Sequence, residues 1–402
     1  MKIGDVKMNI LKLSKDFYWI GIADKELRVF DIIMETKYGT TYNSYLLKTE
    51  DGVVLFETVK LKFFDEYIEK VKELTPIEDI KYIVCSHTEP DHSGSLQRML
   101  EMNPNIKVVS SFAANRNLNE IVNESFHSLV VKDEEELKLK DKTLRFLSVP
   151  NLHWPDTMYT YIVEDKILVT CDSFGAHYAS DEMLLSKVED RTNYEDAFQY
   201  YTTMIMGPFK SFIKKALDKI KPLEIDLIAP GHGLIIDGEV DDAIQKYQDF
   251  IKEQPKDKVK VVIPYVSAYG YTKEMAEIIC SEIKANNIDC DMYDLVVSDD
   301  AMVFDEMVKA DAILYGSCTI LGDALPPIYN LMNRLISGYH GVKKVSAFGS
   351  YGWSGEAVNN LLVRLKQQKM KVVDEGCRII FKPSDAQKEE IREYARNFIS
   401  KI

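Results

Sequence analysis

The pattern of hydrophobic and polar positions divides the chain near residue 255. Before that point short apolar runs predominate, among them 17–22, 44–48 and 52–56, and Asp51-Gly52 is a hairpin turn signal between the last two. Residues 61–75 instead have the apolar spacing of a helix. By the same reasoning we predict strands at 82–85, 106–109, 144–150, 158–163, 166–170 and 225–229, and helices at 96–102, 113–123 and 194–220.

Residues 251–258 form a polar break that contains Pro255, and we place a domain boundary there, between domains 1–252 and 253–402. Beyond it strands and helices alternate. We predict strands at 260–266, 289–295, 312–315, 344–348 and 377–381, and helices at 273–285, 302–308, 328–335, 356–368 and 386–399. This order is typical of a doubly wound α/β domain with a parallel sheet. Pro264 is at odds with a central strand, because it offers no N–H to the neighbouring strand.

One short motif has the character of a metal site. The apolar run 82–85 leads into His87, Glu89, Asp91 and His92, in the pattern H-x-E-x-D-H. Crowded carboxylates repel each other unless a cation binds them, and these residue types are common metal ligands. The motif therefore predicts a metal site, with a solvated acidic turn as the alternative.

Three further strand ends carry a histidine or an aspartate: His153, then Asp172 with His177 nearby, then His232. Rigid strand ends are suitable positions for ligands, so we expect these loops to combine with the motif in one composite site. Taken singly, each residue also fits an ordinary structural role. His153 could be a hydrogen-bonded core histidine, and Asp172 could cap a turn. The two remaining histidines, His127 and His340, lie outside such loops and are interpreted as incidental.

The second domain should bind its ligand outside the carboxyl ends of its strands. The first loop there leads into a helix N-terminus, a natural phosphate cradle, but it is neither G-x-G-x-x-G nor a Walker loop. The third loop offers Tyr351 and Trp353 to a flat ring. We therefore predict flavin mononucleotide (FMN), with a ligand-free receiver-like domain as the alternative. The predicted FMN-binding residues are Ser267, Ala268, Tyr269, Gly270, Tyr271, Thr272, Ser317, Cys318, Thr319, Ile320, Ser350, Tyr351, Gly352, Trp353 and Gly355.

Composition narrows the class of protein. The net charge of −14 argues against nucleic acid as a partner, and is compatible with docking of a small basic or metal-bearing protein. None of the six cysteines forms a C-x-x-C pair, which argues against a structural zinc site or an iron–sulfur module and favours a reducing compartment. Because no signal-peptide pattern or membrane-length apolar run is present, we expect a cytoplasmic enzyme.

The motifs together resemble those of the flavodiiron proteins, also called A-type flavoproteins. These motifs are H-x-E-x-D-H-x-G, L-H-W-P-D-T, C-D-S-F-G and P-G-H-G, followed by G-S-x-T and F-G-S-Y-G-W-S-G. The resemblance covers nearly the whole chain and fits the minimal two-domain class of the family. It implies an N-terminal metallo-β-lactamase-like αββα sandwich followed by a C-terminal flavodoxin-like domain. It further implies a non-haem diiron centre that reduces dioxygen to water, nitric oxide to nitrous oxide, or both, and so protects an anaerobic-type cytoplasm.

The resemblance also implies roles for individual residues. It assigns His87, Glu89 and His153 to one iron, and Asp91 and His232 to the other. Asp172 would bridge the two irons. His92 matches a position that ligates iron in some members only, and His177 matches a histidine near the site. Asp31 stands where some members have a histidine beside the pocket, which leaves the choice of gas open.

The chemistry of the residues agrees with iron. Zinc hydrolases of this fold commonly show H-x-H-x-D-H, and Glu89 replaces the second histidine here, which makes a harder and more anionic ligand set. The resemblance further implies a head-to-tail homodimer or a dimer of dimers, and an external donor such as a rubredoxin-like protein or reduced deazaflavin. Two other classes remain: a metallo-hydrolase with a flavodoxin-like docking domain, and a redox-sensing or carrier protein without turnover.

Overall fold

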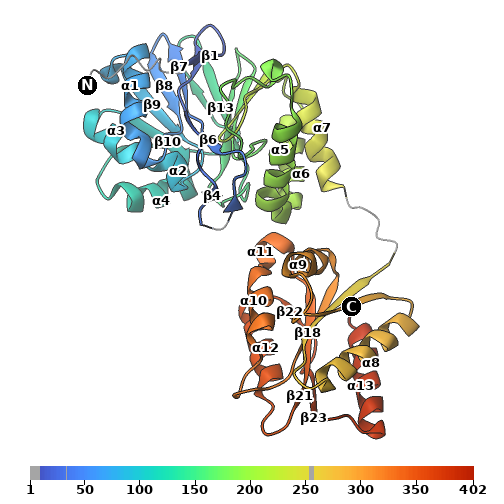
Figure 1. The fold of residues 1–402 in the computed structure, drawn as a ribbon. Coiled ribbons are helices and arrows are strands. Elements are labelled where there is room, and N and C mark those ends of the chain that lie inside the picture. The colour runs from blue at the N-terminus through green and yellow to red at the C-terminus, as the bar shows by residue number, and fades with distance from the viewer. Residues whose placement is uncertain (1–9, 33, 253–257) are drawn as a thin grey trace, which may run out of the picture. The chain divides into compact units, whose positions relative to one another are not determined.

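A computed structural model describes residues 10–32, 34–252 and 258–402 (Figure 1). The chain divides into two compact units, Met1–Lys252 and Glu253–Ile402. Most of the polar break predicted at 251–258 lies outside the described residues. Among the described residues, no helix has the length and apolar character needed to cross a membrane.

Unit 1 is built on two stacked sheets. The first has the order β1-β2-β7-β8-β9-β10-β11, with the strands Leu11–Lys12, Phe17–Trp19, Tyr45–Thr49, Gly52–Phe56, Ile80–Cys85, Lys107–Ser111 and His127–Val131. The second runs β12 to β17 in sequence order, with the strands Glu136–Lys138, Thr143–Ser148, Met158–Ile162, Ile167–Cys171, Leu227–Pro230 and Ile236–Asp237. Two small ribbons pair β3 (Ile22–Asp24) with β6 (Thr40–Tyr42), and β4 (Val29–Phe30) with β5 (Met34–Glu35).

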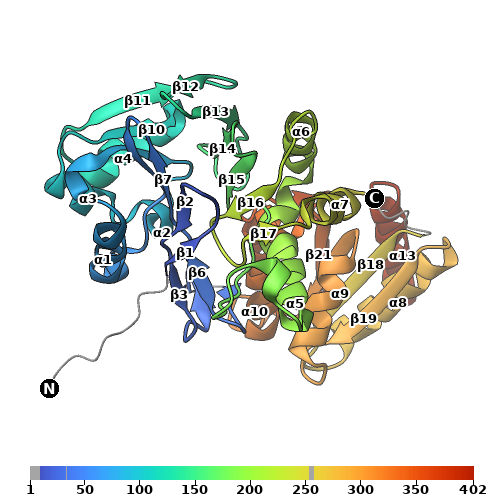
Figure 2. The same ribbon diagram turned by 90° about the horizontal axis from the view of Figure 1, so that it is seen from above.

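Helices cover the outer face of each sheet (Figures 1 and 2). The first sheet carries α1 (Phe64–Leu74), α3 (Leu96–Met102) and α4 (Phe112–Val122), and the second carries α5 (Thr192–Tyr201), α6 (Lys210–Ile220) and α7 (Val240–Ile251). Successive side chains of a strand point to opposite faces of the sheet, so each strand contributes both to the layer between the sheets and to the layer under the helices. In β7, Tyr45 and Leu47 pack between the sheets, whereas Leu46 packs under the helices. The predicted αββα sandwich is confirmed.

Some elements of unit 1 differ from the prediction. The single helix expected over 194–220 is interrupted by a π-helical segment, Thr202–Met206, and a 3-10 turn, Gly207–Phe209. Pro208 lies in that turn, where its ring cannot continue an α-helix from the residues before it. Helix α7 was not predicted from the apolar pattern, nor was the helical turn α2 (Pro90–Ser93) inside the metal motif.

Unit 2 has one parallel sheet of order β19-β18-β20-β21-β22, with β23 also paired to β21, as predicted. The strands are Lys260–Val266 (β18), Asp289–Asp294 (β19), Ala312–Ser317 (β20), Lys344–Tyr351 (β21), Lys371–Val372 (β22) and Cys377–Ile380 (β23). Helices α8 (Tyr271–Ala285) and α13 (Asp385–Ile399) pack on one face. Helices α9 (Asp300–Lys309), α10 (Pro326–Arg334) and α12 (Glu356–Gln367) pack on the other, and α11 is Ser337–His340.

Pro264 does lie in the central strand β18. Its register with β19 is continuous through Pro264 and Tyr293, but the register with β20 passes from Val262 directly to Tyr265. The strand therefore accommodates the missing N–H by a local gap in its pairing with one neighbour.

Candidate metal centre

The predicted metal ligands of unit 1 come together at one end of the two sheets. His87 and Glu89 lie in the loop after β9, and Asp91 and His92 lie in the turn α2 that follows it. His153 comes from the β13–β14 connection. Asp172 and His232 follow the neighbouring parallel strands β15 and β16. His87, Asp172 and His232 thus follow closely on buried strands, whereas His153 lies in the middle of a longer connection.

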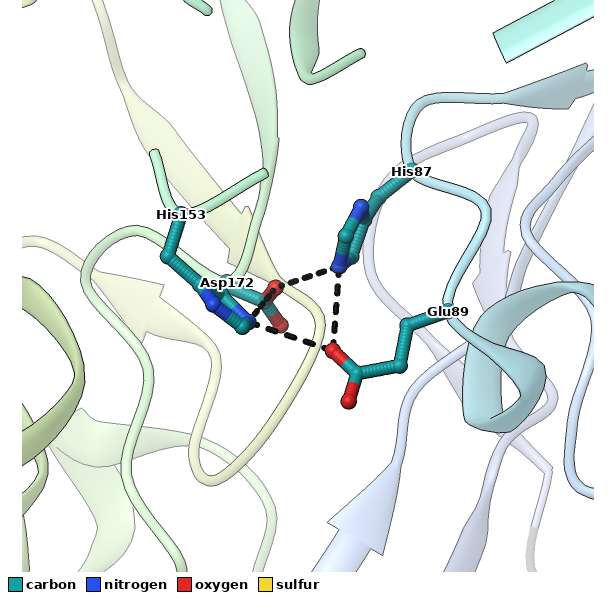
Figure 3. A group of neighbouring side chains, drawn as sticks. All are labelled: His87, Glu89, His153 and Asp172. Atoms are coloured by element: carbon teal, nitrogen blue, oxygen red, sulfur yellow. Dashed lines mark hydrogen bonds and ion pairs between the residues drawn. The ribbon is translucent and has the colours of Figure 1, made fainter. Parts of the chain in front are cut away.

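Four of these side chains form a first cluster, shown in Figure 3. His87 Nε2 lies 3.1 Å from Glu89 Oε2 and 3.4 Å from Asp172 Oδ2. His153 Nε2 lies 3.2 Å and 3.3 Å from the same two oxygens. One ligand atom from each of the four residues thus faces a common centre, with all four atoms within 4.8 Å of one another.

Asp91, His92 and His232 form a second cluster on the other side of Asp172. His232 Nε2 lies 3.1 Å from Asp91 Oδ2 and 3.4 Å from Asp172 Oδ1. His92 Nε2 lies 3.1 Å from Asp172 Oδ1 and 3.5 Å from Asp91 Oδ2. Asp172 therefore presents Oδ2 to the first cluster and Oδ1 to the second.

The charges and contacts of the clusters fit a cation site. Both carboxylate oxygens of Asp91 and Oδ2 of Asp172 are buried and have no hydrogen-bond partner, although imidazole nitrogens lie 3.1–3.4 Å from Asp91 Oδ2 and Asp172 Oδ2. Buried polar side chains normally have hydrogen-bond partners. Carboxylates and imidazoles that face a shared centre without such partners have the arrangement of ligands around an ion. Burial alone would raise the pKa of Asp172, but His92, His153 and His87 hold it well below its usual range.

The pKa values of these three histidines are shifted in the opposite direction, upward. Burial alone would lower the pKa of His87, yet its bonds to Asp156 and Glu89 raise it to about 9. The pKa of His153 is likewise raised, against burial, to about 10 by Asp172 and Glu89. Without a cation, protons therefore occupy the nitrogens that face the centre.

Partners behind the histidines fix how the rings point. His87 Nδ1 lies 3.3 Å from Asp156 Oδ1, and Asp156 Oδ2 accepts hydrogen bonds from the N–H and hydroxyl of Thr88, at 2.8 Å and 2.6 Å. His232 Nδ1 donates to the carbonyl of Thr41 at 2.5 Å. These contacts leave Nε2 of each ring for the centre. The sequence reasoning missed Asp156, although it is the aspartate of L-H-W-P-D-T.

Gly231 in P-G-H-G has a steric role. A Cβ at this position would lie 2.7 Å from His92 Cε1 and 3.1 Å from the backbone of Cys171. Any larger residue would therefore push apart the two loops that carry the second cluster.

His177 lies next to the centre but belongs to neither cluster. Its Nδ1 bonds Thr40 Oγ1 at 2.9 Å, and its ring lies 4.5 Å from the ring of Phe30 and 5.2 Å from that of His232. Its Nε2 is buried and has no hydrogen-bond partner. His177 thus forms part of the wall beside His232.

Asp31 also lies beside the centre. Burial and the neighbouring Glu89 raise the pKa of Asp31 to about 6, and Lys60 Nζ lies 3.6 Å from its carboxylate. The two histidines interpreted as incidental lie elsewhere: His127 is exposed on β11, and His340 is in α11 of unit 2, with its ring 5.2 Å from that of Phe304.

The three predicted flavin loops follow β18, β20 and β21, which are adjacent strands of the sheet in unit 2. Ser350 joins them: its hydroxyl lies 2.8 Å from Thr272 Oγ1, and its carbonyl accepts the N–H of Thr319 at 3.1 Å. The loops are shorter than predicted, because α8 already begins at Tyr271 and β21 continues to Tyr351.

The exposed groups of these loops fit a flat phosphorylated ligand. Trp353 is 98% exposed, Leu321 is 100% exposed and Tyr269 is 82% exposed, which is costly for large apolar groups without a ligand or partner. Helix α8 has no side-chain cap at Gly270, although the N–H of Lys273 in its first turn donates to Ser267 Oγ at 3.2 Å. The N-terminus of a helix favours an anion such as a phosphate. The residues of the loops are therefore suited to FMN.

The fold and the two clusters define a metalloprotein that joins a metallo-β-lactamase-like domain to a flavodoxin domain. Residues 40–233 match the family described as ODP family beta lactamase, and residues 263–394 match the flavodoxin family. A flavo-diiron protein of Clostridium acetobutylicum is 38% identical over 401 residues, which cover 98% of this chain and 100% of the relative. A nitric oxide reductase of Moorella thermoacetica is 33% identical, with 97% of this chain and 98% of the relative covered.

Solved structures show the same likeness. The rubredoxin oxygen:oxidoreductase of Desulfovibrio gigas superimposes with a TM-score of 0.72 at 26% identity, over 98% of each chain. The flavodiiron protein of Giardia intestinalis gives 0.69 at 29% identity, over 97% of each chain. The chain belongs to the flavodiiron proteins, a family of oxidoreductases whose cofactors are a diiron centre and FMN.

Proposed function

We propose that this protein reduces dioxygen to water, nitric oxide to nitrous oxide, or both, at a diiron centre in residues 1–252, with electrons from FMN in residues 253–402. The observation that carries the proposal is the position of Asp172, with one carboxylate oxygen in each of two buried ligand clusters. The names of two relatives add support: one is a nitric oxide reductase and the other a rubredoxin oxygen:oxidoreductase.

The residues present would hold two irons with Asp172 between them. His87, Glu89 and His153 would hold the first, and Asp91, His92 and His232 the second. Two ferrous ions and one reduced flavin together supply the four electrons that convert dioxygen to two waters, whereas coupling two nitric oxide molecules needs two. Glu89 makes the first cluster more anionic than a zinc hydrolase set, and this favours the redox function over the hydrolase alternative.

The surrounding residues keep the centre dry and orient its ligands. The rings of Phe30, Tyr201 and Tyr42 pack around His177 and His232, at centroid distances of 4.5–6.1 Å. A water-excluded wall strengthens the electrostatic interactions inside it. Access is left at the first cluster, where Glu89 and His153 are 15% and 18% exposed. Lys60 stands near this opening with its Nζ 4.3 Å from the Phe30 ring centroid, and supplies a positive charge.

We further propose a head-to-tail homodimer, either alone or as a dimer of dimers, in which the flavin of one chain faces the irons of the next. Exposed apolar side chains support it. Trp353 and Leu321 lie on the flavin loops, and Ile32, 93% exposed, lies in the β4–β5 hairpin next to Asp31. A second copy would cover both surfaces.

The electron donor and the compartment stay predictions. A rubredoxin-like protein or a reduced deazaflavin would deliver electrons to FMN. The cytoplasm is supported by the six cysteines, all of which are free thiols.

Metal analysis and kinetics test the function together. Protein purified without oxygen should contain two irons and one FMN per chain, and after full reduction it should oxidise rapidly when mixed with dioxygen or nitric oxide in a stopped-flow instrument. Two zinc ions with no flavin would support the hydrolase. Iron and flavin without reaction with either gas would support the carrier.

A further inference from the structure

Glu57 is a buried carboxylate that none of the sequence motifs contains. It directly follows β8, is 1% exposed and has a positive φ of 59°. Its N–H donates to the carbonyl of Val84 at 2.9 Å, and its Oε1 accepts the N–H of Ser86 at 2.9 Å. The carboxylate is therefore directed under the start of the metal loop.

The next residue holds the end of the same loop. The N–H and hydroxyl of Thr58 both donate to the carbonyl of His92, at 2.7 Å and 2.6 Å. Glu57 and Thr58 together fix the backbone of the loop at Ser86 and at His92. The short segment after β8 thus determines where the His92 ring can point.

His92 lies between the second cluster and a group of buried polar atoms. Its Nε2 faces Asp172 and Asp91, and its Nδ1 lies 3.8 Å from Cys171 Sγ. A carboxylate oxygen of Glu57, the Cys171 sulfur and a ring nitrogen of His92 lie within 4.8 Å of one another. Glu57 Oε2 has no hydrogen-bond partner. At this separation one water can bond both the carboxylate and the ring.

A closer arrangement of this kind occurs at His87. Asp156 Oδ1 lies 3.3 Å from His87 Nδ1, on the side of the ring away from the first cluster, whereas the Glu57 carboxylate lies near His92 without bonding its ring directly. A carboxylate in this position orients a ligating histidine and raises its basicity. His87 and His92 therefore each have an acidic residue behind them, one for each cluster.

We propose that Glu57 is the positioning residue of His92, and that it holds the ring with Nε2 directed at the second metal position. His92 is then a ligand in this chain. The inference rests on the proposed function, because it takes the two clusters as a metal centre.

Titration of metal-free protein with ferrous ion under anaerobic conditions tests the proposal. Glu57→Gln should weaken binding of one iron about 10–100-fold and leave the other unchanged, as expected for the loss of a carboxylate behind a ligand. Asp156→Asn should weaken the other iron. Glu50→Gln, at an exposed position, serves as the control. In ⁵⁷Fe-loaded protein, Mössbauer spectra should show that the two acidic variants alter different iron signals.

A double-variant comparison separates positioning from general damage. If Glu57 acts through His92, then Glu57→Gln should change iron binding by less than about twofold in a His92→Gln background. Glu57→Asp retains the carboxylate and should recover part of the affinity. If Glu57→Gln does not fold, Glu57→Ala, which also removes the carboxylate, takes its place in the titration.

Equal weakening of both irons, no weakening of either, or the same loss with and without His92 would overturn the assignment of Glu57. Wild-type protein that does not bind two irons would instead overturn the proposed function.

Discussion

Asp156 stands behind His87, with Oδ1 3.3 Å from Nδ1, while its other oxygen accepts two hydrogen bonds from Thr88. Asp156→Asn keeps the shape but removes the charge that favours Nε2 of His87 as a ligand. We expect the affinity for one iron to fall about 10–100-fold. Titration with ferrous ion measures this, and Asp218→Asn, on the exposed face of α6, is the matched control. An unchanged affinity would show that Thr88 alone suffices to hold the loop.

Asp172 is the only residue that contacts both clusters among the described ligands. Asp172→Asn should therefore lose both irons and all turnover together, because an amide cannot supply two anionic oxygens. Iron analysis and gas consumption on the same sample measure the two losses. A variant with two irons and normal turnover would refute the bridging role.

The pH dependence of stability should differ between metal-free and metal-loaded protein. In the metal-free fold the pKa of His87 is raised to about 9 and that of His153 to about 10. The folded state then holds these protons more tightly than the unfolded state does. The stability that these two protonated histidines contribute to the folded state is complete below the ordinary histidine pKa of about 6.5. It is lost as the pH rises through about 9 to 10.

Thermal unfolding of the metal-free protein between pH 6 and 10 measures this loss. His153→Gln should flatten the decline, since it removes one of the rings whose pKa is raised, which also include His87 and His92. An equally steep decline in that variant would assign the pH dependence to other groups.

The predicted contact of Trp353 with the flavin ring can be tested by substitution. Trp353→Ala should weaken FMN binding about fivefold or more, because an aromatic contact contributes about 1 kcal/mol beyond buried area. Equilibrium dialysis measures the affinity. Val297→Ala, which trims another exposed apolar residue of unit 2, should leave it unchanged. If both variants bound FMN with equal affinity, the flavin ring would not contact Trp353.

Mixed dimers test the arrangement of subunits. A chain that carries Asp172→Asn keeps its flavin, and a chain that cannot bind FMN keeps its irons. In a head-to-tail dimer the mixture should regain turnover, because one of its two flavin–iron pairs is complete. No recovery, with mixed dimers demonstrated by mass spectrometry, would indicate transfer within one chain.

The sequence was sufficient to predict which side chains gather at the candidate centre and the layers of both units. His87, Asp172 and His232 follow closely on the ends of apolar strands, and that pattern is local. The partners behind the ligands were not predictable, because Glu57 and Asp156 reach Ser86 and His87 only through the pairing of distant segments. In the sequence each resembles an ordinary acidic turn residue. The interruption at 202–209 was also missed, since apolar spacing continues through it.

The most direct test of the central claim is the electron count with dioxygen. Protein with two ferrous ions and fully reduced FMN should consume about one dioxygen per chain and release no hydrogen peroxide, because four electrons are available and water is the product. An oxygen electrode and a peroxide assay on the same anaerobic sample measure both quantities. Consumption of about two dioxygen molecules with stoichiometric peroxide, or no consumption at all, would contradict the account.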